Sequence, residues 1–314
     1  MIRSGRTALR VRLLGLLLAA GLGPMTGCGN HSSGPLAGGG ITWTRITPAQ
    51  AGPADRPDWR GDSIAFQTAA GGFVRIAASR KDGSGFAIYP APPGANERAP
   101  RWVDSTLLVY SGDQIGTEDI WYLDLATNAT RRLTNFAGGE WDPAPRPGSP
   151  GLVYIEAGDS LGGRLTLLPD TAAAPLAPVY LTPVGLKALE PSFDVAGDRI
   201  CFAARGAGAS SQIWTVTLSS PNPPVQLTTG GNRDRSPRFS PDGTKILFIS
   251  NRGGRWGLWT VSPQGEGVAL GLLTYDAPWA ELRHAAWSPS GGEIVVSSDR
   301  QGERALWVLS NLSP

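Results

Sequence analysis

Short apolar runs recur at regular intervals along this chain, with polar or glycine-rich segments between them. The clearest runs occupy residues 64–66, 107–110, 152–155, 200–203, 246–249 and 294–296. Their residues are continuously apolar instead of alternating, which is typical of β-strands that are buried on both faces. The pattern therefore predicts sheets that are each packed between two neighbours.

A longer repeat contains these runs. A Pro-x-aromatic start precedes them at residues 57, 100, 191 and 237, with Ala285-Ala286-Trp287 as a variant and Pro143-Ala144-Pro145 as a degenerate copy. The steps between starts are 43, 43, 48, 46 and 48 residues, a period that suits four short strands. A third strand carries Trp121, Trp214, Trp259 and Trp307, and a fourth strand ends in Leu-Thr at 133–134, 181–182, 227–228 and 273–274.

The two ends of the repeat complement each other. Only five residues follow Leu309, so the sixth copy lacks its own fourth strand, yet Arg45-Ile46-Thr47 has the missing signature before the first start. We therefore expect an all-β, six-bladed β-propeller over residues 41–314, with its last blade closed by the N-terminal strand. Closure of this kind removes exposed sheet edges. An open solenoid is the alternative, and it leaves the spare strand unexplained.

Residues 236–252 carry a family resemblance. Ser-Pro-Arg-Phe-Ser-Pro-Asp-Gly-Thr-Lys-Ile-Leu-Phe-Ile-Ser-Asn-Arg resembles the WD40-like (PD40) repeat of TolB-type propellers. The resemblance extends over residues 41–314 and is strongest in this fifth copy. It implies a six-bladed propeller that takes part in protein–protein interactions in the bacterial cell envelope.

The N-terminal residues have the features of an export signal. Four arginines precede an apolar run at 13–22, which is shorter than the roughly 20 residues of a membrane-spanning helix. Met25-Thr26-Gly27-Cys28 resembles a bacterial lipobox, which implies a signal peptide over 1–27 and a lipid on Cys28. Residues 28–40 are then a flexible, glycine-rich tether. Gly29, by resemblance to the lipoprotein sorting rule, favours the outer membrane. The alternative is an ordinary cleaved signal with an incidental Cys.

Charge and cysteine content narrow the possible functions. Without the four signal-peptide arginines, 24 basic residues face 26 acidic ones, so no excess positive charge remains to attract nucleic acid. Cys201, the other cysteine, lies inside an apolar run, which predicts a buried and unreactive thiol.

The chemistry-bearing residues do not predict an enzyme. Gly158-Asp159-Ser160-Leu161 spells the nucleophile block of one esterase class, but no Asp stands at the required spacing before His284. One His and one buried Cys in the fold are too few for a transition-metal site, and we expect no cofactor. The alternative is an enzyme that acts on saccharides in the propeller channel, with His284 as its base.

The connections before each first strand are the candidate binding site. In propellers these connections gather around the mouth of the central channel, and here they are rich in acidic residues and arginine. Trp141 lies outside the third-strand position, so we expect it to be exposed on this rim. The alternative is a solvated ring of salt bridges that only ties the blades together. The candidate residues, for a protein partner or a peptidoglycan or glycan ligand, are Asp55, Arg56, Glu97, Arg98, Glu140, Trp141, Glu190, Asp234, Arg235, Arg283 and His284.

Overall fold

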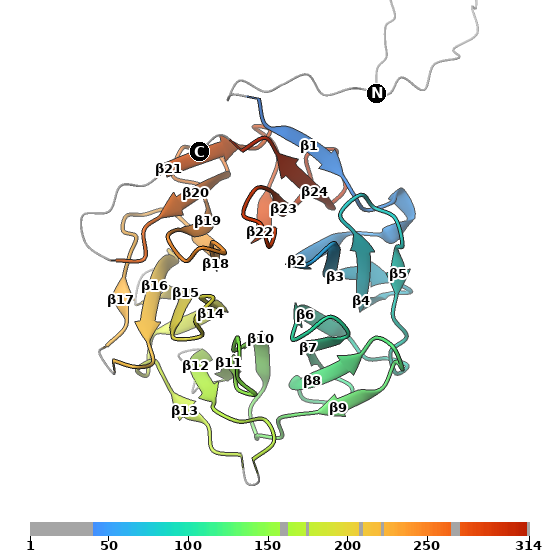
Figure 1. Ribbon diagram of the computed structural model, residues 1–314, viewed down its shortest axis with the longest axis vertical. Coiled ribbons are helices and arrows are strands. Elements are labelled where there is room, and N and C mark those ends of the chain that lie inside the picture. The colour runs from blue at the N-terminus through green and yellow to red at the C-terminus, as the bar shows by residue number, and fades with distance from the viewer. Residues whose placement is uncertain are drawn as a thin grey trace, which may run out of the picture. The chain divides into compact units, whose positions relative to one another are not determined.

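Six four-stranded antiparallel sheets surround a central channel in the computed structural model (Figure 1). The structure describes residues 40–157, 163–173, 176–206, 210–220, 223–264 and 271–312. The prediction of a six-bladed β-propeller is confirmed. One short 3-10 helix, η1 (Ala49–Ala51), accompanies the strands in this part of the chain. No helix among the described residues has the length and apolarity needed to span a membrane.

The first three blades follow one another along the chain, each running from the channel outward. Blade 1 consists of β2 (Ala54–Arg60), β3 (Ser63–Ala70), β4 (Phe73–Arg80) and β5 (Ala87–Ile88). Blade 2 consists of β6 (Glu97–Trp102), β7 (Leu107–Gly112), β8 (Asp119–Asp124) and β9 (Thr130–Arg132). Blade 3 consists of β10 (Glu140–Pro145), β11 (Leu152–Ala157), β12 (Gly163–Leu168) and β13 (Val179–Tyr180).

The other three blades complete the ring. Blade 4 consists of β14 (Lys187–Phe193), β15 (Arg199–Arg205), β16 (Gln212–Thr217) and β17 (Val225–Gln226). Blade 5 consists of β18 (Asp234–Phe239), β19 (Ile246–Ser250), β20 (Gly257–Val261) and β21 (Gly271–Tyr275). Blade 6 consists of β22 (Leu282–Trp287), β23 (Ile294–Ser298), β24 (Ala305–Ser310) and the N-terminal β1 (Thr42–Arg45).

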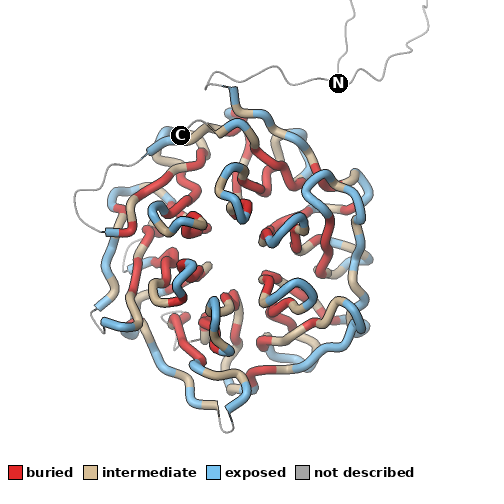
Figure 2. The backbone as a smooth tube through the Cα atoms, in the orientation of Figure 1, coloured by how far each residue is buried: buried red, intermediate tan, exposed pale blue. Residues whose placement is uncertain are grey.

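The second strand of every blade is buried on both faces, as the continuous apolar runs predicted (Figure 2). Phe66, Tyr110, Tyr154, Phe202 and Phe248 are all fully buried in these strands. Six hydrophobic clusters lie in the described part of the chain, and each combines residues of two neighbouring blades. The core is therefore divided among the six blade interfaces, and every blade depends on both of its neighbours.

The closing strand lies where the sequence predicted it. β1 pairs antiparallel with β24, with Thr44 opposite Val308 and Arg45 opposite Trp307. The contact continues beyond the strand, because Ile46 N–H donates to the carbonyl of Leu306 at 3.0 Å. Ile46 is itself buried in the cluster between blades 6 and 1. The N-terminal segment therefore supplies both the last strand of the ring and part of an interface core.

The remaining expectations concern the two cysteines, the tether and the esterase-like block. Cys201 is fully buried, as predicted, and burial raises the pKa of its thiol to about 12, which disfavours the reactive thiolate. The lipobox with Cys28, the tether and the esterase-like block at 158–161 lie outside the described residues.

Deletion of residues 41–47 should destabilise the whole ring. The deletion removes the partner of β24 and the apolar contacts of Ile46, so blade 6 gains an unpaired edge and an open interface. We expect aggregation, or a melting temperature lowered by many degrees, when the variant is measured by circular dichroism and size-exclusion chromatography. Deletion of residues 30–36 is the matched control and should melt as the wild type does. A monomeric 41–47 deletion with an unchanged melting temperature would contradict this role of β1.

Candidate functional site

The innermost strand of every blade contains a β-bulge at the same place. The register shifts between Asp55 and Asp58 in β2, and at the equivalent positions of β6, β10, β14, β18 and β22. The residue before the repeat's first position adopts a left-handed φ of 51–54° in five blades, although none of the five is glycine. Each residue in this conformation costs about 1 kcal/mol or more of folding free energy. Its repetition shows that the bulge is a property of the architecture, and that it places one residue per blade in the channel.

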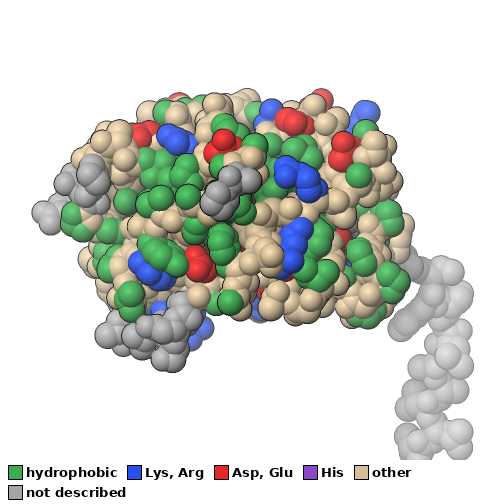
Figure 3. Space-filling view, turned by 90° about the horizontal axis from the view of Figure 1, so that it is seen from below, with side chains coloured by type: hydrophobic (Ala, Val, Ile, Leu, Met, Phe, Trp, Pro, Cys, Tyr) green, Lys and Arg blue, Asp and Glu red, His purple; other side chains and the backbone are tan. Residues whose placement is uncertain are grey.

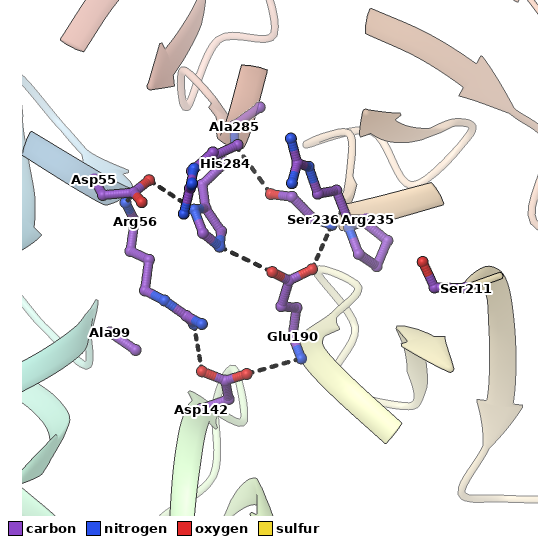
Figure 4. Close-up of polar contacts among 12 residues, drawn as sticks. Asp55, Arg56, Ala99, Asp142, Glu190, Ser211, Arg235, Ser236, His284 and Ala285 are labelled. Carbon is purple, nitrogen blue, oxygen red and sulfur yellow. Dashed lines mark hydrogen bonds and ion pairs between the residues drawn. The ribbon is translucent and has the colours of Figure 1, made fainter. Parts of the chain in front are cut away.

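These six residues, together with Asp55 next to Arg56, form the first ring of the channel, which we call the waist: Arg56, Ala99, Asp142, Glu190, Ser236 and His284. The side chains that carry charge meet one another across the channel (Figure 4). His284 lies between two carboxylates, with Nδ1 2.7 Å from Asp55 Oδ1 and Nε2 2.8 Å from Glu190 Oε1. Glu190 also accepts the Ser236 N–H at 2.6 Å.

The hydrogen bonds of the waist close into a loop. The N–H of Glu190 donates to Asp142 at 3.1 Å, and the Arg56 guanidinium donates to the other oxygen of Asp142. The N–H of Arg56 donates to Asp55 at 2.9 Å, and this hydrogen bond closes the loop. In blade 2 the equivalent residue is Ala99, whose methyl group leaves room for Arg56 to reach blade 3 (Figure 4). Five of the six blades are thereby linked at the centre of the ring.

Mutual pairing shifts the ionisation of the waist residues. Burial opposes the charge on Asp55, but the charge and hydrogen bond of His284 outweigh it and hold the Asp55 pKa below its usual value. Burial is likewise outweighed at Glu190, where His284 and Arg56 lower the pKa to about 2. Burial favours neutral His284, yet Asp55 and Glu190 hold the pKa of His284 above its usual value. The waist is therefore a network of charged side chains that are ion-paired and hydrogen-bonded to one another.

The waist also narrows the channel. A small cavity between the waist and the next ring of inner-strand residues has a volume of about 10 Å³, which is room for about one water molecule. We call the end with the connections before each inner strand the connection face, and the end with the turns between first and second strands the hairpin face.

The hairpin face opens into a cavity of about 770 Å³, which we call the funnel. One aromatic side chain from each of five blades walls it, and each also packs against an interface cluster, which fixes its position. These residues are Trp59, Trp102, Phe193, Phe239 and Trp287. Asp58, Arg101 and Arg238 line the floor of the funnel, next to the waist.

Four of the candidate residues meet in the waist. Asp55, Arg56, Glu190 and His284 come together there, deeper than the rim on which His284 was expected. Glu97, Glu140 and Asp234 do not reach the mouth: each is the first residue of an inner strand and is fully buried. Their expected placement is wrong because the alternation along the strand turns them into the blade interfaces, where Asp234 pairs with Arg252 at 2.6 Å.

The other three arginines among the candidate residues do lie on the connection face. Arg98, Arg235 and Arg283 have partly exposed side chains, and each is paired with acidic residues. Arg235 and Arg283 share Glu281, at 3.1 Å each. Arg235 also stacks on Trp256 with its guanidinium carbon 3.8 Å from the ring centroid. Arg304 also lies 3.9 Å from Glu281, so the arginines of this part of the rim are engaged in ion pairs although they outnumber the carboxylate that they share.

Trp141 is the clearest error among the candidates. Its side chain is partly buried and packs against the hydrophobic cluster between blades 3 and 4, so it is not an exposed rim aromatic. Gly163 on β12 leaves the space for the indole, since a Cβ there would lie 2.9 Å from Trp141 Cζ2. The exposed tryptophan of this face is instead Trp279, which is 77% exposed in the connection before β22.

Sequence reasoning missed Ser236 and the floor residues Arg101 and Arg238. The sequence contains the information needed to find them. When the repeat starts are aligned, the residue before each start belongs to the waist and the residue two positions later belongs to the floor. No group of three or more His, Cys, Asp or Glu side chains in the described ranges is arranged to hold a metal ion. The described side chains in Figure 3 intersperse basic and acidic groups along that side of the propeller.

Solved structures similar to this chain include two TolB proteins and a lyase. A protein described as a TolB from Agrobacterium tumefaciens has a TM-score of 0.63 and 16% identity, and the match covers 86% of this chain and 97% of that one. TolB from Acinetobacter baumannii has a TM-score of 0.57 and 17% identity, with 87% of this chain matching 64% of that one. An oligogalacturonate lyase in complex with manganese has a TM-score of 0.59 and 13% identity, with coverages of 85% and 92%.

These similarities show the fold alone, because all three sequence identities are below 25%. The names of the proteins also indicate different activities. No protein-family model matches the chain, and no curated protein sequence matches it. The site must therefore be interpreted from its own geometry.

Replacement of His284 by Gln should cost stability in a pH-dependent way. The raised pKa of His284 contributes stability that is complete below its usual value of 6.5 and is lost as the pH rises through the folded-state value. The lowered pKa values of Asp55 and Glu190 contribute stability above about pH 4.5. We expect His284→Gln to lose about 3–5 kcal/mol of unfolding free energy at pH 6, and clearly less at pH 9.

Urea denaturation followed by tryptophan fluorescence at both pH values measures this difference. Buried Glu97 and Glu140, whose pKa values burial raises to about 7 and 8, titrate in the same window but cancel between wild type and variant. His31→Gln, the same change outside the propeller, is the control and should have no effect. An equal loss at pH 6 and pH 9 would show that His284 acts by packing alone.

Proposed function

We propose that this protein is a non-catalytic, TolB-like propeller that is anchored in the bacterial cell envelope and binds a protein partner through the funnel. The observation that carries the proposal is the funnel itself, an opening of about 770 Å³ on the hairpin face with aromatic walls and arginines in its floor. Tryptophan and arginine are enriched among the residues that dominate binding energy at protein interfaces. A volume of this size accommodates a side chain or a short peptide segment.

The exposed rim of the funnel supports a protein partner. Val195, in the turn between β14 and β15, is apolar and 66% exposed. Ser105 and Pro289 line the same opening from blades 2 and 6. A stable interface buries about 800 Å² on each partner, and the hairpin turns around the funnel can supply such an area. A partner that inserts a residue into the funnel would rest on these turns.

The connection face supports binding less well. Its arginines are already paired with Glu281, Asp113 and Glu118, so a partner would have to break existing ion pairs. Trp279 is exposed there, but its indole N–H already points to the carbonyl of Arg300 at 3.4 Å. The pairing fits the interpretation of this rim as a set of contacts that tie the blades together.

An enzyme acting on saccharides in the channel is the alternative, and an oligogalacturonate lyase is among the structural neighbours. In this alternative the catalytic base of the present protein would be His284. Its imidazole is buried between two carboxylates that favour the protonated form, and both ring nitrogens are hydrogen-bonded to them. A general base must have a free nitrogen within reach of the substrate. The geometry of His284 therefore favours a structural role and the non-catalytic proposal.

The anchoring part of the proposal rests on the sequence. The lipobox-like Met25-Thr26-Gly27-Cys28 would place a lipid on Cys28, and the glycine-rich residues that follow would tether the propeller near the membrane. Gly29 favours retention in the outer membrane.

Site-specific photo-crosslinking in intact cells tests the binding face. With p-benzoylphenylalanine at position 195, in the funnel rim, we expect a discrete covalent adduct with one envelope protein, identified by mass spectrometry. The matched control carries the crosslinker in place of Trp279, which is still more exposed but lies on the connection face. An adduct at 279 and none at 195, or an adduct with glycan alone, would contradict the proposal.

Cys28→Ser tests the anchor separately. Several acyl groups, at about 0.8 kcal/mol per buried CH₂, hold a protein firmly at a membrane, so their loss should release it. We expect the variant to move from the membrane fraction to the soluble periplasmic fraction, or to accumulate with its signal uncleaved. Cys201→Ser, the same change at the buried cysteine, should fractionate like the wild type. Unchanged membrane association of Cys28→Ser would refute lipid anchoring.

A further inference from the structure

The most unusual charged group in the molecule is Arg238, in the floor of the funnel. The residue is only 8% exposed, and its guanidinium makes no ion pair within the described part of the chain. Of its five N–H donors, one is given to the carbonyl of Pro237 at 3.2 Å, and the buried Nε–H has no partner. A buried cation with unused donors is costly unless something supplies the missing charge.

No residue in the described part of the chain makes a direct ion pair with Arg238. Arg101 and Asp58 occupy with Arg238 one ring of equivalent positions, two residues beyond the waist. Asp58 is already paired with Arg101, at 3.0 Å from its Nε. The remaining positions of this ring are Ala144, Ser192 and Ala286, which carry no charge. The floor therefore has one more positive than negative charge, whereas the waist has one more negative than positive charge, and the charge of Glu190 in the waist acts on Arg238 without pairing with it.

The ionisation of Arg238 agrees with this geometry. Burial first, and then the like charge of Arg101, lower the pKa of Arg238 to about 10. The arginine nevertheless stays protonated at neutral pH, so the positive charge is held at the bottom of the funnel. Arg238 and Arg101 border both the funnel and the small cavity of the waist, which places them at the end of the opening.

We propose that the floor of the funnel binds a carboxylate of an acidic peptide segment, with Arg238 and Arg101 as its receptors. The inference deepens the proposed function, on which it rests for the view that the occupant is part of a protein. Arginine pairs with a carboxylate through two parallel hydrogen bonds, and Arg238 has the donors to do so.

The walls of the funnel agree with a peptide. Trp59 and Trp102 use their indole N–H groups within the protein, on the carbonyls of Gly61 and Asp58, so these two side chains offer their apolar rings to an occupant. An acidic residue can pass its methylene groups along such walls and place its carboxylate against the floor. The ligand chemistry is therefore a glutamate or aspartate residue, or the terminal carboxylate of a polypeptide, on an otherwise uncharged segment.

Isothermal titration calorimetry with the full mature protein tests the proposal. The probe is a blocked ten-residue peptide of glycine and serine with one central glutamate, and its counterpart carries glutamine there. We expect the glutamate peptide to bind measurably and the glutamine peptide at least about tenfold more weakly. Equal binding of the two peptides, or tighter binding of inorganic phosphate or digalacturonate than of the glutamate peptide, would overturn the proposal.

Variants of Arg238 provide the second test. Arg238→Gln should lose at least about tenfold in affinity for the glutamate peptide. Arg205→Gln removes the same charge at the exposed end of β15 and should bind like the wild type. Arg238→Met should also raise the melting temperature of the free protein by a few degrees, since it removes an unpaired buried charge. A lowered melting temperature together with unchanged peptide binding by Arg238→Gln would instead assign Arg238 a structural role.

The two proposals fail separately. A protein adduct at position 195 with no preference for glutamate over glutamine would retain the binding face and discard the carboxylate site. A clear glutamate preference with no protein adduct at position 195 would retain the carboxylate site and discard the protein partner.

Discussion

Closure of the ring is the constraint on which the rest of this structure depends. Each blade is apolar on both faces and can bury them only against two neighbours, so six interface cores exist or fail together. The pairing of β1 with β24 provides the last of these contacts. Closure also forces six innermost strands to converge, and their bulges then bring Asp55, Glu190 and His284 within hydrogen-bond distance although they are far apart in sequence.

The converging strands create two rings with opposite electrostatic character. In the waist, His284 and Arg56 pair with Asp55, Glu190 and Asp142, so two cations face three carboxylates, and these contacts across the channel stabilise the fold. One layer further, Asp58 pairs with Arg101 and leaves Arg238 without an ion-pair partner. A buried guanidinium with unused hydrogen-bond donors is a feature that stability alone does not explain, and such features concentrate at binding sites. This feature supports the proposal that recognition takes place on the hairpin face.

The sequence predicted the architecture well because the repeat is carried by local patterns. Continuous apolar runs, the Pro-x-aromatic starts and the spare Arg45-Ile46-Thr47 segment each determine strand burial or register directly. The candidate site was predicted only in part, because the side to which a residue points depends on the bulge. The bulge turned Glu190 and His284 inward, while neighbouring Glu140 and Trp141 entered the interface between blades. The lone charge of Arg238 becomes visible only when the residues around it are placed in space.

The most direct test of this account is solution NMR of the arginine Nε–Hε groups in the protein, with and without the glutamate-containing peptide. The account predicts that the signals of Arg238 and Arg101 shift on titration and that Hε of Arg238 becomes protected from exchange with water. It also predicts that Arg235 and Arg283, on the connection face, keep their positions. Shifts confined to Arg235 and Arg283, with Arg238 unchanged, would contradict the assignment of the binding site to the funnel.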